Sequence, residues 1–120
     1  QLRELSMQLG QLRQLRHLMC SNNRLTELPT SIGMLVRLET LDLENNRLTH
    51  LPLEIGQLDA LKTLNCVTNQ LAELPRTLSQ LNLQLKISVS RNPLQRPPLE
   101  VVRQGMPVIR RYFHDIEKGP

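Results

Sequence analysis

The sequence predicts an α/β fold, a right-handed solenoid with a parallel, concave sheet on one side and short helical or 3₁₀ returns on the convex side. The stretch LRHLMCSNNRLTELP of residues 15–29 recurs with changes at residues 38–52 and again at 61–75. The segment between copies is long enough to bring the chain back to a parallel strand beside the previous one. Only 2% of the residues are aromatic, and leucine returns at a fixed step, which indicates repetition of one structural unit.

The repeat has a period of 23 residues. Four leucine columns keep this step: Leu15/Leu38/Leu61, Leu18/Leu41/Leu64, Leu25/Leu48/Leu71 and Leu28/Leu51/Leu74. An asparagine column keeps it too: Asn23, Asn46, Asn69 and Asn92. An amide carries donors and an acceptor, so we expect these asparagines to form a structural ladder that satisfies the backbone of adjacent turns. The fourth copy stays in register, although Gln84 stands where a leucine is due.

Each unit divides into a strand and a return. Residues at alternate positions of HLMCS, TLDLE, TLNCV and KISVS are predicted to point into the core, namely Leu18/Cys20, Leu41/Leu43, Leu64/Cys66 and Ile87/Val89. Pro29, Pro52 and Pro75 are unsuited to a strand ladder but suit the first turn of a helix, so each is expected to open a return. The returns would carry inward Ile32/Leu35, Ile55/Leu58 and Leu78/Leu81.

We predict a repeat array over residues 1–97 and a helical cap over residues 98–120. The array comprises a half repeat (1–14), three full repeats (15–37, 38–60 and 61–83) and a degenerate closing repeat (84–97). A stack of repeats exposes its core at both ends unless something covers it. In the cap, Pro97-Pro98 opens a first helix, Gly105 ends it and Pro107 starts a second. An apolar stripe is predicted from Val102, Met106, Ile109, Phe113 and Ile116.

The first 14 residues allow two interpretations, because Ser6 stands where the other copies have proline. Leu2, Leu5, Leu9, Leu12 and Leu15 fit a continuous amphipathic helix that would act as an N-terminal cap. Alternatively, residues 1–14 are the second half of a repeat in an array whose upstream neighbours are absent. We leave both open at this point.

The unit L-x-x-L-x-L/C-x-x-N-x-L-x-x-L-P resembles the leucine-rich repeat over residues 1–97. The pattern L-P-x-x-I-G-x-L-x-x-L is similar to the intracellular 23-residue class of Ras-signalling scaffolds, scribble-like proteins and Roco GTPases. The ending NPLQRPPLEVVRQGMPVIRRYF (92–113) is similar to the termination of such arrays, including those of Roco proteins. No G-x-x-x-x-G-K-[ST] motif occurs, so the resemblance implies a binding domain and no GTPase activity.

Charge and cysteine usage bear on the compartment. The formal net charge is +4, and residues 91–120 hold six Lys/Arg but only three Asp/Glu, so the basic excess lies at the C-terminal end. Cys20 and Cys66 occupy one core column and are expected to be free, buried thiols. The sequence contains neither an apolar run of membrane-spanning length nor a signal-peptide pattern. These features favour the cytoplasm, and the resemblance implies a signalling scaffold.

The sequence predicts no enzyme, cofactor or metal site. His17, His50 and His114 fall on a strand, a loop and the last helix, without the spacing of metal ligands. Asp42 and Glu44 face outward together, but an open sheet lacks the enclosed pocket that acid–base catalysis needs.

We expect instead a protein-interaction module that binds a protein partner on the concave sheet. Outward positions vary between repeats while buried columns hardly change, which a partner-specific surface requires. The expected contact residues are His17, Met19, Ser21, Asn22, Arg24, Thr40, Asp42, Glu44, Asn45, Arg47, Thr63, Asn65, Val67 and Thr68. The partner's identity and the oligomeric state are not predicted, and no small-molecule substrate is expected.

The sequence allows two other functions to be considered. The first is a regulatory or dimerising domain of a larger signalling enzyme, such as a Roco GTPase or a kinase. The second is binding of nucleic acid or an acidic membrane through Arg91, Arg96, Arg103, Arg110, Arg111 and Lys118. Three acidic residues dilute this set and no exposed aromatic platform accompanies it, so the sequence argues against the second function.

Overall fold

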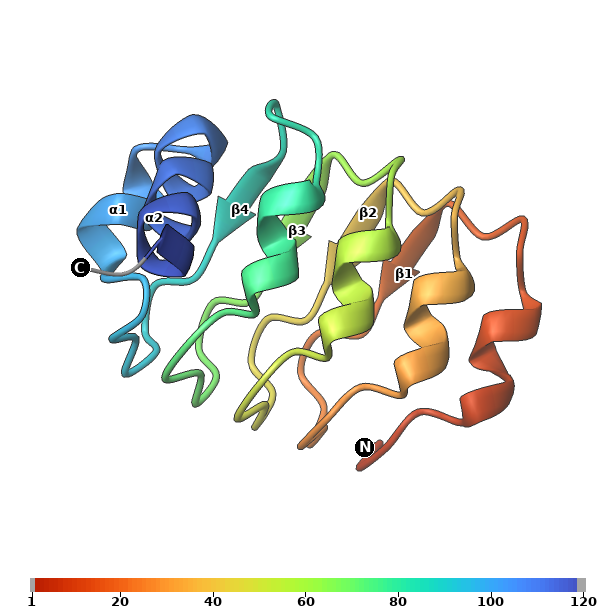
Figure 1. The fold of residues 1–120 in the computed structure, drawn as a ribbon. Coiled ribbons are helices and arrows are strands. Elements are labelled where there is room, and N and C mark those ends of the chain that lie inside the picture. Colours follow the sequence, from red (N-terminus) through yellow and green to blue (C-terminus); the bar gives the residue numbers. More distant parts are fainter. Residues whose placement is uncertain (1, 119–120) are drawn as a thin grey trace.

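The computed structural model describes residues 2–118 and confirms the solenoid, with the strands along one side, short helices along the other and the last two helices closing the C-terminal end (Figure 1). The strands are β1 (His17–Met19), β2 (Thr40–Asp42), β3 (Thr63–Asn65) and β4 (Lys86–Ser88). The 3₁₀ returns are η1 (Met7–Gln11), η2 (Thr30–Met34), η3 (Leu53–Gln57) and η4 (Arg76–Gln80). The α-helices are α1 (Leu99–Arg103) and α2 (Met106–Lys118). The principal extents are 41 × 26 × 21 Å.

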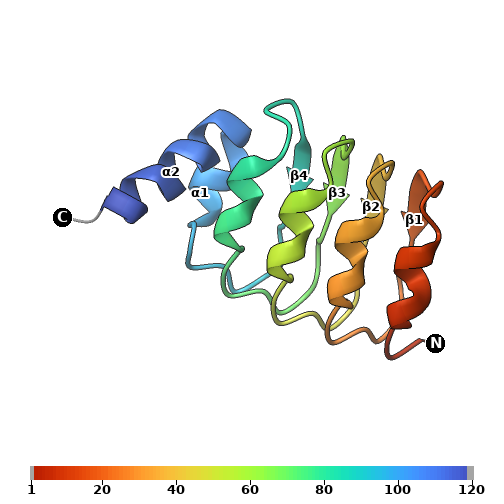
Figure 2. The same cartoon turned by 45° about the vertical axis from the view of Figure 1, so that its right-hand side comes forward.

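The four strands form one parallel sheet in the order β1-β2-β3-β4. Its register follows the sequence period, since Thr40 lies opposite both His17 on β1 and Thr63 on β3, and Thr63 lies opposite Lys86 on β4. Figure 2 shows the same stacking from a second direction, with each return beside the next. Equivalent residues of successive repeats therefore lie side by side.

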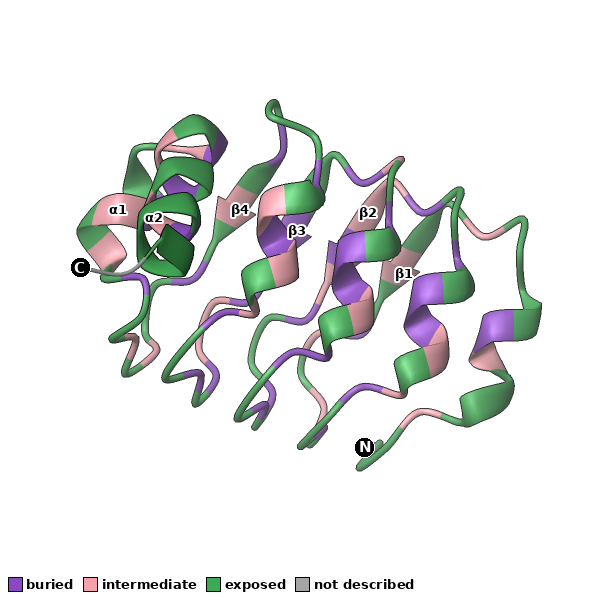
Figure 3. Ribbon diagram, viewed as in Figure 1, coloured by how far each residue is buried: buried purple, intermediate pink, exposed green. Residues whose placement is uncertain are grey.

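The core fills the space between the sheet and the returns (Figure 3). Side chains of the middle repeats are completely buried there, among them Leu25, Ile32, Leu35, Leu38, Leu41, Leu43, Leu48, Ile55, Leu58, Leu61, Leu64 and Leu71. Burial is less complete in the N-terminal half repeat, where Leu12 is 55% exposed although its counterpart Leu35 is 0% exposed. The continuous core is thus made by stacking, as expected for units that cannot bury their apolar side alone.

Proline and glycine shape the returns. Pro29, Pro52 and Pro75 are the N-cap residues of η2, η3 and η4, with extended backbone angles, which confirms that each opens a return. The glycine column allows neighbouring returns to approach closely. A Cβ at Gly56 would lie 2.6 Å from Thr77 Cβ and 2.7 Å from Thr77 O, and Gly33 has a similar conflict with the backbone of η3.

Each asparagine of the ladder joins two successive turns. Asn69 Nδ2 donates to Cys66 O of its own repeat at 3.1 Å and to Leu43 O of the preceding repeat at 2.9 Å. Its Oδ1 accepts from Leu48 N–H at 3.0 Å. Asn46 and Asn92 make the same three contacts. An unpaired buried backbone group costs about 1–3 kcal/mol, so each amide removes several such costs at once.

The N-terminal segment has the conformation of a half repeat, which favours the second of the two interpretations over a continuous helix through Leu2 to Leu15. Residues 7–11 form η1, and Ser6 Oγ accepts from Gln8 N–H at 3.0 Å, so serine starts this return where proline starts the others. Leu2 N–H donates to Asn23 Oδ1 at 2.9 Å, and Arg24 N–H donates to Leu2 O at 2.7 Å. These bonds hold the backbone at Leu2 against the following repeat, which leaves it unavailable to a helix.

The C-terminal helices cover the last repeat. Pro98 is the N-cap residue of α1, and the chain turns at Gly105, whose φ is +93°, before α2 begins. Arg110 on α2 donates to the backbone oxygens of Ser79 and Leu81 at 2.9 and 3.1 Å. Ser79 is the residue of η4 that corresponds to Gly33 in η2 and Gly56 in η3. No further 3₁₀ return follows η4 among residues 2–118, and α2 packs against it instead.

The predicted apolar stripe of this end is mostly correct. Val102, Met106, Ile109 and Phe113 are buried, each 7% exposed or less. Ile116 is 53% exposed and does not join them, because the stripe extends past the last return that α2 can cover. In the degenerate repeat, Gln84 is exposed and the next residue, Leu85, is buried in its place.

We predict that Gly56→Ala lowers the free energy of unfolding by about 1–3 kcal/mol, because the new methyl group would collide with the backbone of η4. Urea denaturation followed by circular dichroism measures the change. Ser79→Ala, in the same column at the end of the stack, is the matched control and should cost much less. Equal losses from both variants would contradict the close-approach argument.

Candidate interaction face

The outward side chains of the four strands and of the turns after them form one surface, which we name the sheet face. Most of its predicted contact residues are exposed: His17, Met19, Asn22, Arg24, Glu44, Asn45, Arg47 and Thr63. The others are half-buried: Ser21, Thr40, Asp42, Asn65, Val67 and Thr68. The register aligns His17, Thr40 and Thr63 in one column across the repeats and Met19, Asp42 and Asn65 in another.

Hydrogen bonds organise the polar centre of the sheet face. Asp42 Oδ1 accepts from Glu44 N–H at 3.1 Å. Asn65 on the neighbouring strand donates through Nδ2 to Glu44 Oε1 at 2.8 Å, while its Oδ1 accepts from Val67 N–H at 3.0 Å. The side chains of Asp42, Glu44 and Asn65 are therefore held in place before any partner arrives, which lowers the entropy lost on binding.

The turn after each strand adds a rim with an unusual backbone. Asn22, Asn45, Thr68 and Arg91 all have a φ close to +60°. Asparagine adopts this left-handed conformation more readily than threonine or arginine does. Asn45 Nδ2 donates to Asn22 Oδ1 at 2.9 Å, which links two successive turns. Beside them, an open hollow of about 270 Å³ is lined by Asn22, Asn23, Arg24, Asn45, Asn46 and Arg47.

Met19 is the most prominent apolar group of the sheet face. Its side chain is 62% exposed on β1, and it stands in the column of Asp42. Val67, half-buried on the same face, adds a second apolar group. A flexible thioether adapts to many partner surfaces, so the face combines an adaptable apolar contact with ordered polar groups.

No residues of the sheet face are arranged for metal binding. Across residues 2–118 there is no group of three or more His, Cys, Asp and Glu side chains that could hold a metal ion. His17, Asp42 and Glu44 lie on an open surface.

Among residues 2–118, no helix has the length and apolarity needed to cross a membrane.

The two cysteines lie just beneath the sheet face and are free thiols. Burial and, to a smaller extent, the nearby Asp42 carboxylate raise the pKa of the Cys66 thiol from its ordinary value of 9.0 to about 12. Burial and Asp42 also raise the pKa of Cys20. Because the thiolate is the reactive form, both side chains serve as packing groups at neutral pH.

The basic residues of the C-terminal end do not form one free surface. Arg96 pairs with Glu73 at 3.1 Å, and Arg110 donates to backbone oxygens of the last repeat. Arg103 lies on α1, and Arg111 and Lys118 lie on α2. Two of the six cations therefore already have intramolecular partners, which weakens the case for a nucleic-acid or membrane surface.

The repeated strand–turn–return unit, the asparagine ladder and the open sheet define a leucine-rich repeat solenoid. A family model described as a leucine-rich repeat region matches residues 3–93. The chain belongs to the leucine-rich repeat family. The finer assignment to the 23-residue intracellular class stays a prediction. A search of curated proteins found no match.

Solved structures agree with this assignment. A leucine-rich repeat protein of Leptospira interrogans is 39% identical over 87% of this chain, with a TM-score of 0.78. The PEPR1–AtPEP1 structure is 30% identical over 76%, with a TM-score of 0.69. The plant peptide hormone receptor RGFR1, in complex with RGF2, is 27% identical over 76%, with a TM-score of 0.53. The matches span only 26%, 13% and 19% of those three chains.

We predict that Cys66 makes stability depend on pH above the ordinary thiol pKa. Between about pH 9 and 12 the unfolded thiol ionises while the folded one stays neutral, so the free energy of unfolding falls as the pH rises. Cys66→Val, which copies Val89 of the same column, should lose less stability between about pH 8 and 10.5. Urea denaturation at both pH values measures this. A parent and a variant with equal slopes would contradict the assigned thiol pKa.

Proposed function

We propose that this chain is a protein-interaction module whose sheet face binds a protein partner. The contact set is the predicted one, centred on Asp42, Glu44, Asn65 and Arg47, with Met19 as the apolar contact. The observation that carries the proposal is the contrast between columns. Buried positions repeat leucine, isoleucine, valine or cysteine, whereas the outward column of β1 to β4 reads Met19, Asp42, Asn65 and Ser88.

The sheet face offers an apolar contact and oriented charged groups to a partner. A solvated surface that only maintains solubility needs neither an exposed methionine nor ordered acidic groups in its centre. The bond from Asn65 to Glu44 orients a carboxylate that is still exposed, so a partner's cation can approach it. Exposed arginines at the rim, Arg24 and Arg47, offer the opposite charge to the same partner.

The comparisons support a protein or peptide as the ligand class. One similar structure is a plant peptide hormone receptor in complex with RGF2, and another is the PEPR1–AtPEP1 structure. Leucine-rich repeats are open scaffolds whose ligand is set by the side chains of the surface, and a fold does not by itself determine a ligand. These similarities therefore support the binding of a protein or peptide, and the partner has to be identified by experiment.

We predict that Asp42→Lys/Glu44→Lys abolishes binding without unfolding the chain. Reversing two central charges replaces attraction by repulsion, and the expected loss of affinity is at least about 100-fold. The measurement is capture of a partner from the extract of the source cells, followed by titration of the identified partner. Circular dichroism confirms that parent and variant fold equally.

The matched control is Glu54→Lys/Asp59→Lys, which changes the net charge by the same amount on the side of the returns. It should bind like the parent. If the control loses the partner as well, the effect is one of net charge only. If both variants retain the partner at the parent's affinity, the interaction does not use the centre of the sheet face.

A further inference from the structure

Two arginines occupy the same position in successive repeats, in the turn that follows the strand. Arg24 belongs to the turn after β1, and Arg47 belongs to the turn after β2. Asn22 N–H donates to Glu44 O at 2.9 Å, so hydrogen bonds join these two turns as they join the strands. Neighbouring strands of a sheet lie about 5 Å apart, and the two arginine backbones are therefore close neighbours.

This pair of cations has no counter-charge within the described part of the chain. Arg24 and Arg47 are exposed, and neither takes part in an ion pair among residues 2–118. The column of Arg16, Glu39 and Lys62 is different, because its signs alternate and Glu39 pairs with the two cations at 3.8 and 3.4 Å. Like charges at neighbouring positions repel each other. An anion bound between Arg24 and Arg47 would remove that repulsion.

The hollow between the two turns adds further hydrogen-bond donors. We name it the arginine hollow; its volume is about 270 Å³, and its lining residues are Asn22, Asn23, Arg24, Asn45, Asn46 and Arg47. None of these residues is acidic. Asn45 Nδ2 donates to Asn22 Oδ1, which leaves Asn22 Nδ2 without an acceptor among residues 2–118. Two guanidinium groups and one amide can therefore donate to the same small anion.

The backbone around the arginine hollow is fixed before any ligand binds. Arg24 N–H donates to Leu2 O at 2.7 Å, and Arg47 N–H donates to Leu25 O at 2.8 Å. The buried side chain of Asn46 belongs to the asparagine ladder and holds the second turn against the first repeat. Binding therefore needs to order only the two arginine side chains, which lowers its entropic cost.

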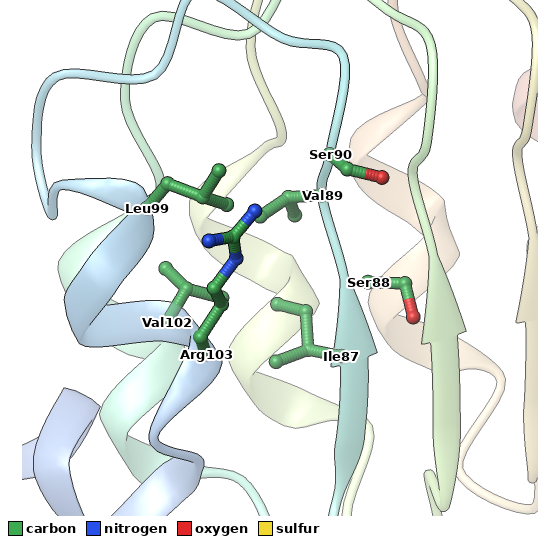
Figure 4. Close-up of a pocket in the computed structure, with 7 residues that line it drawn as sticks. All are labelled: Ile87, Ser88, Val89, Ser90, Leu99, Val102 and Arg103. Carbon is green, nitrogen blue, oxygen red and sulfur yellow. The ribbon is translucent and has the colours of Figure 1, made fainter.

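The space between β4 and α1 is larger but offers a different environment. Its volume is about 410 Å³, and Figure 4 shows Leu99 and Val102 of α1 extending toward β4. Arg103 is the one charged residue in its lining. A single exposed cation beside apolar side chains does not define a ligand. A repeated cation without a counter-charge, in a polar hollow, specifies an anion with more than one negative charge.

We propose that the arginine hollow binds a phosphorylated side chain of the partner protein. A phosphoryl group carries a charge of about −1.5 to −2 at neutral pH and has three strong acceptor oxygens. Its charge matches two guanidinium groups, whereas a carboxylate brings one charge that a single arginine already satisfies. This inference rests on the proposed function, because the arginine hollow is part of the sheet face, and it adds the chemical class of one group of the partner.

The acidic centre of the sheet face favours a phosphoprotein over a polyanion. Glu44 is exposed and lies three residues before Arg47 in the same turn, and Asp42 lies at the end of β2. A nucleic-acid strand or an anionic membrane would bring further negative charges against these carboxylates. A protein brings one phosphoryl group and can place a basic residue beside it. We therefore expect a lysine or arginine of the partner close to its phosphorylated residue.

The test uses three synthetic peptides that differ at one position. They are acetyl-Ala-Lys-Ala-phosphoserine-Ala-Lys-Ala-amide and the same peptide with serine or glutamate in place of phosphoserine. A lysine on each side covers both directions of the partner chain. Titrated into the ¹⁵N-labelled chain, the phosphopeptide should shift the amide signals of Asn22, Arg24, Asn45 and Arg47 in a saturable way. The serine and glutamate peptides should bind at least about tenfold more weakly.

Variants of the chain test the two cations. Arg24→Gln and Arg47→Gln should each weaken phosphopeptide binding at least about tenfold. Both arginines are exposed and form no ion pair among residues 2–118, so the variants should fold. Arg76→Gln on η4 removes the same charge on the side of the returns and is the matched control. It should bind the phosphopeptide like the parent.

Inorganic phosphate and an oligothymidylate, titrated at constant ionic strength, distinguish the source of the anion. Phosphate should shift the same amides at least about tenfold more weakly than the phosphopeptide, because it lacks the lysines that face Asp42 and Glu44. Asp42→Lys/Glu44→Lys should still bind phosphate, since the arginines remain. If partner capture depends on Asp42 and Glu44 but the phosphopeptide does not bind, only the phosphoryl assignment fails and the proposed function stands.

Four results would overturn the inference. The first is the absence of saturable shifts with the phosphopeptide. The second is equal affinity for the serine or glutamate peptide, because the site would then not select a phosphoryl group. The third is inorganic phosphate that binds as tightly as the phosphopeptide, which would make the free ion the ligand. The fourth is an oligothymidylate that binds more tightly than the phosphopeptide, which would indicate a nucleic-acid surface.

Discussion

The asparagine ladder is the constraint on which the rest of the solenoid depends. A strand that must turn sharply into a return leaves backbone groups pointing into the core, where water cannot reach them. The amides of Asn46, Asn69 and Asn92 satisfy those groups, and each one reaches into the preceding repeat as well. Register, spacing and direction of the strands therefore follow from one side chain per repeat. The leucines then fill a space whose dimensions the ladder has set.

The ends of the stack follow different rules from its middle. Between neighbours, glycine permits close approach and the leucines are fully buried. At the C-terminal end, Ser79 replaces glycine, Arg110 donates to carbonyls of the last repeat, and Phe113 packs on the core. The cap thus supplies at this end the cover that the next repeat supplies in the middle of the stack.

Much of the fold could be predicted from the sequence, because each structural pattern of a repeat protein recurs several times along the chain. The strand and return of every repeat and the buried columns follow from the 23-residue step, and the two cap helices follow from proline, glycine and the apolar stripe after it. The sequence could not decide between a helix through Leu2 to Leu15 and a half repeat, because leucine spacing is ambiguous over one unit. The structure shows that Leu2 is bonded to the next repeat, a contact between residues 21 positions apart. The prediction that Ile116 joins the buried apolar stripe was wrong, because spacing along a helix does not show where the surface that the helix covers ends.

The candidate site was less accessible to sequence reasoning. Alternation predicted which strand residues face outward, and the structure aligns those of β1, β2 and β3 in columns. Spacing could not predict that Asn65 orients Glu44, because this hydrogen bond depends on the rotamers of two side chains. Thr68 and Arg91 have left-handed backbone angles that their residue types do not suggest, and only their alignment with Asn22 and Asn45 could have signalled it.

Native-state hydrogen exchange of the Leu48 amide tests the role of the asparagine ladder most directly. This N–H donates to the side chain of Asn69 and to no backbone group. If the ladder holds the repeats together, Leu48 should exchange only with global unfolding, at the rate of Cys66, whose N–H is bonded within the sheet. Exchange of Leu48 as fast as that of the exposed turn residue Thr49, while Cys66 stays protected, would contradict the account.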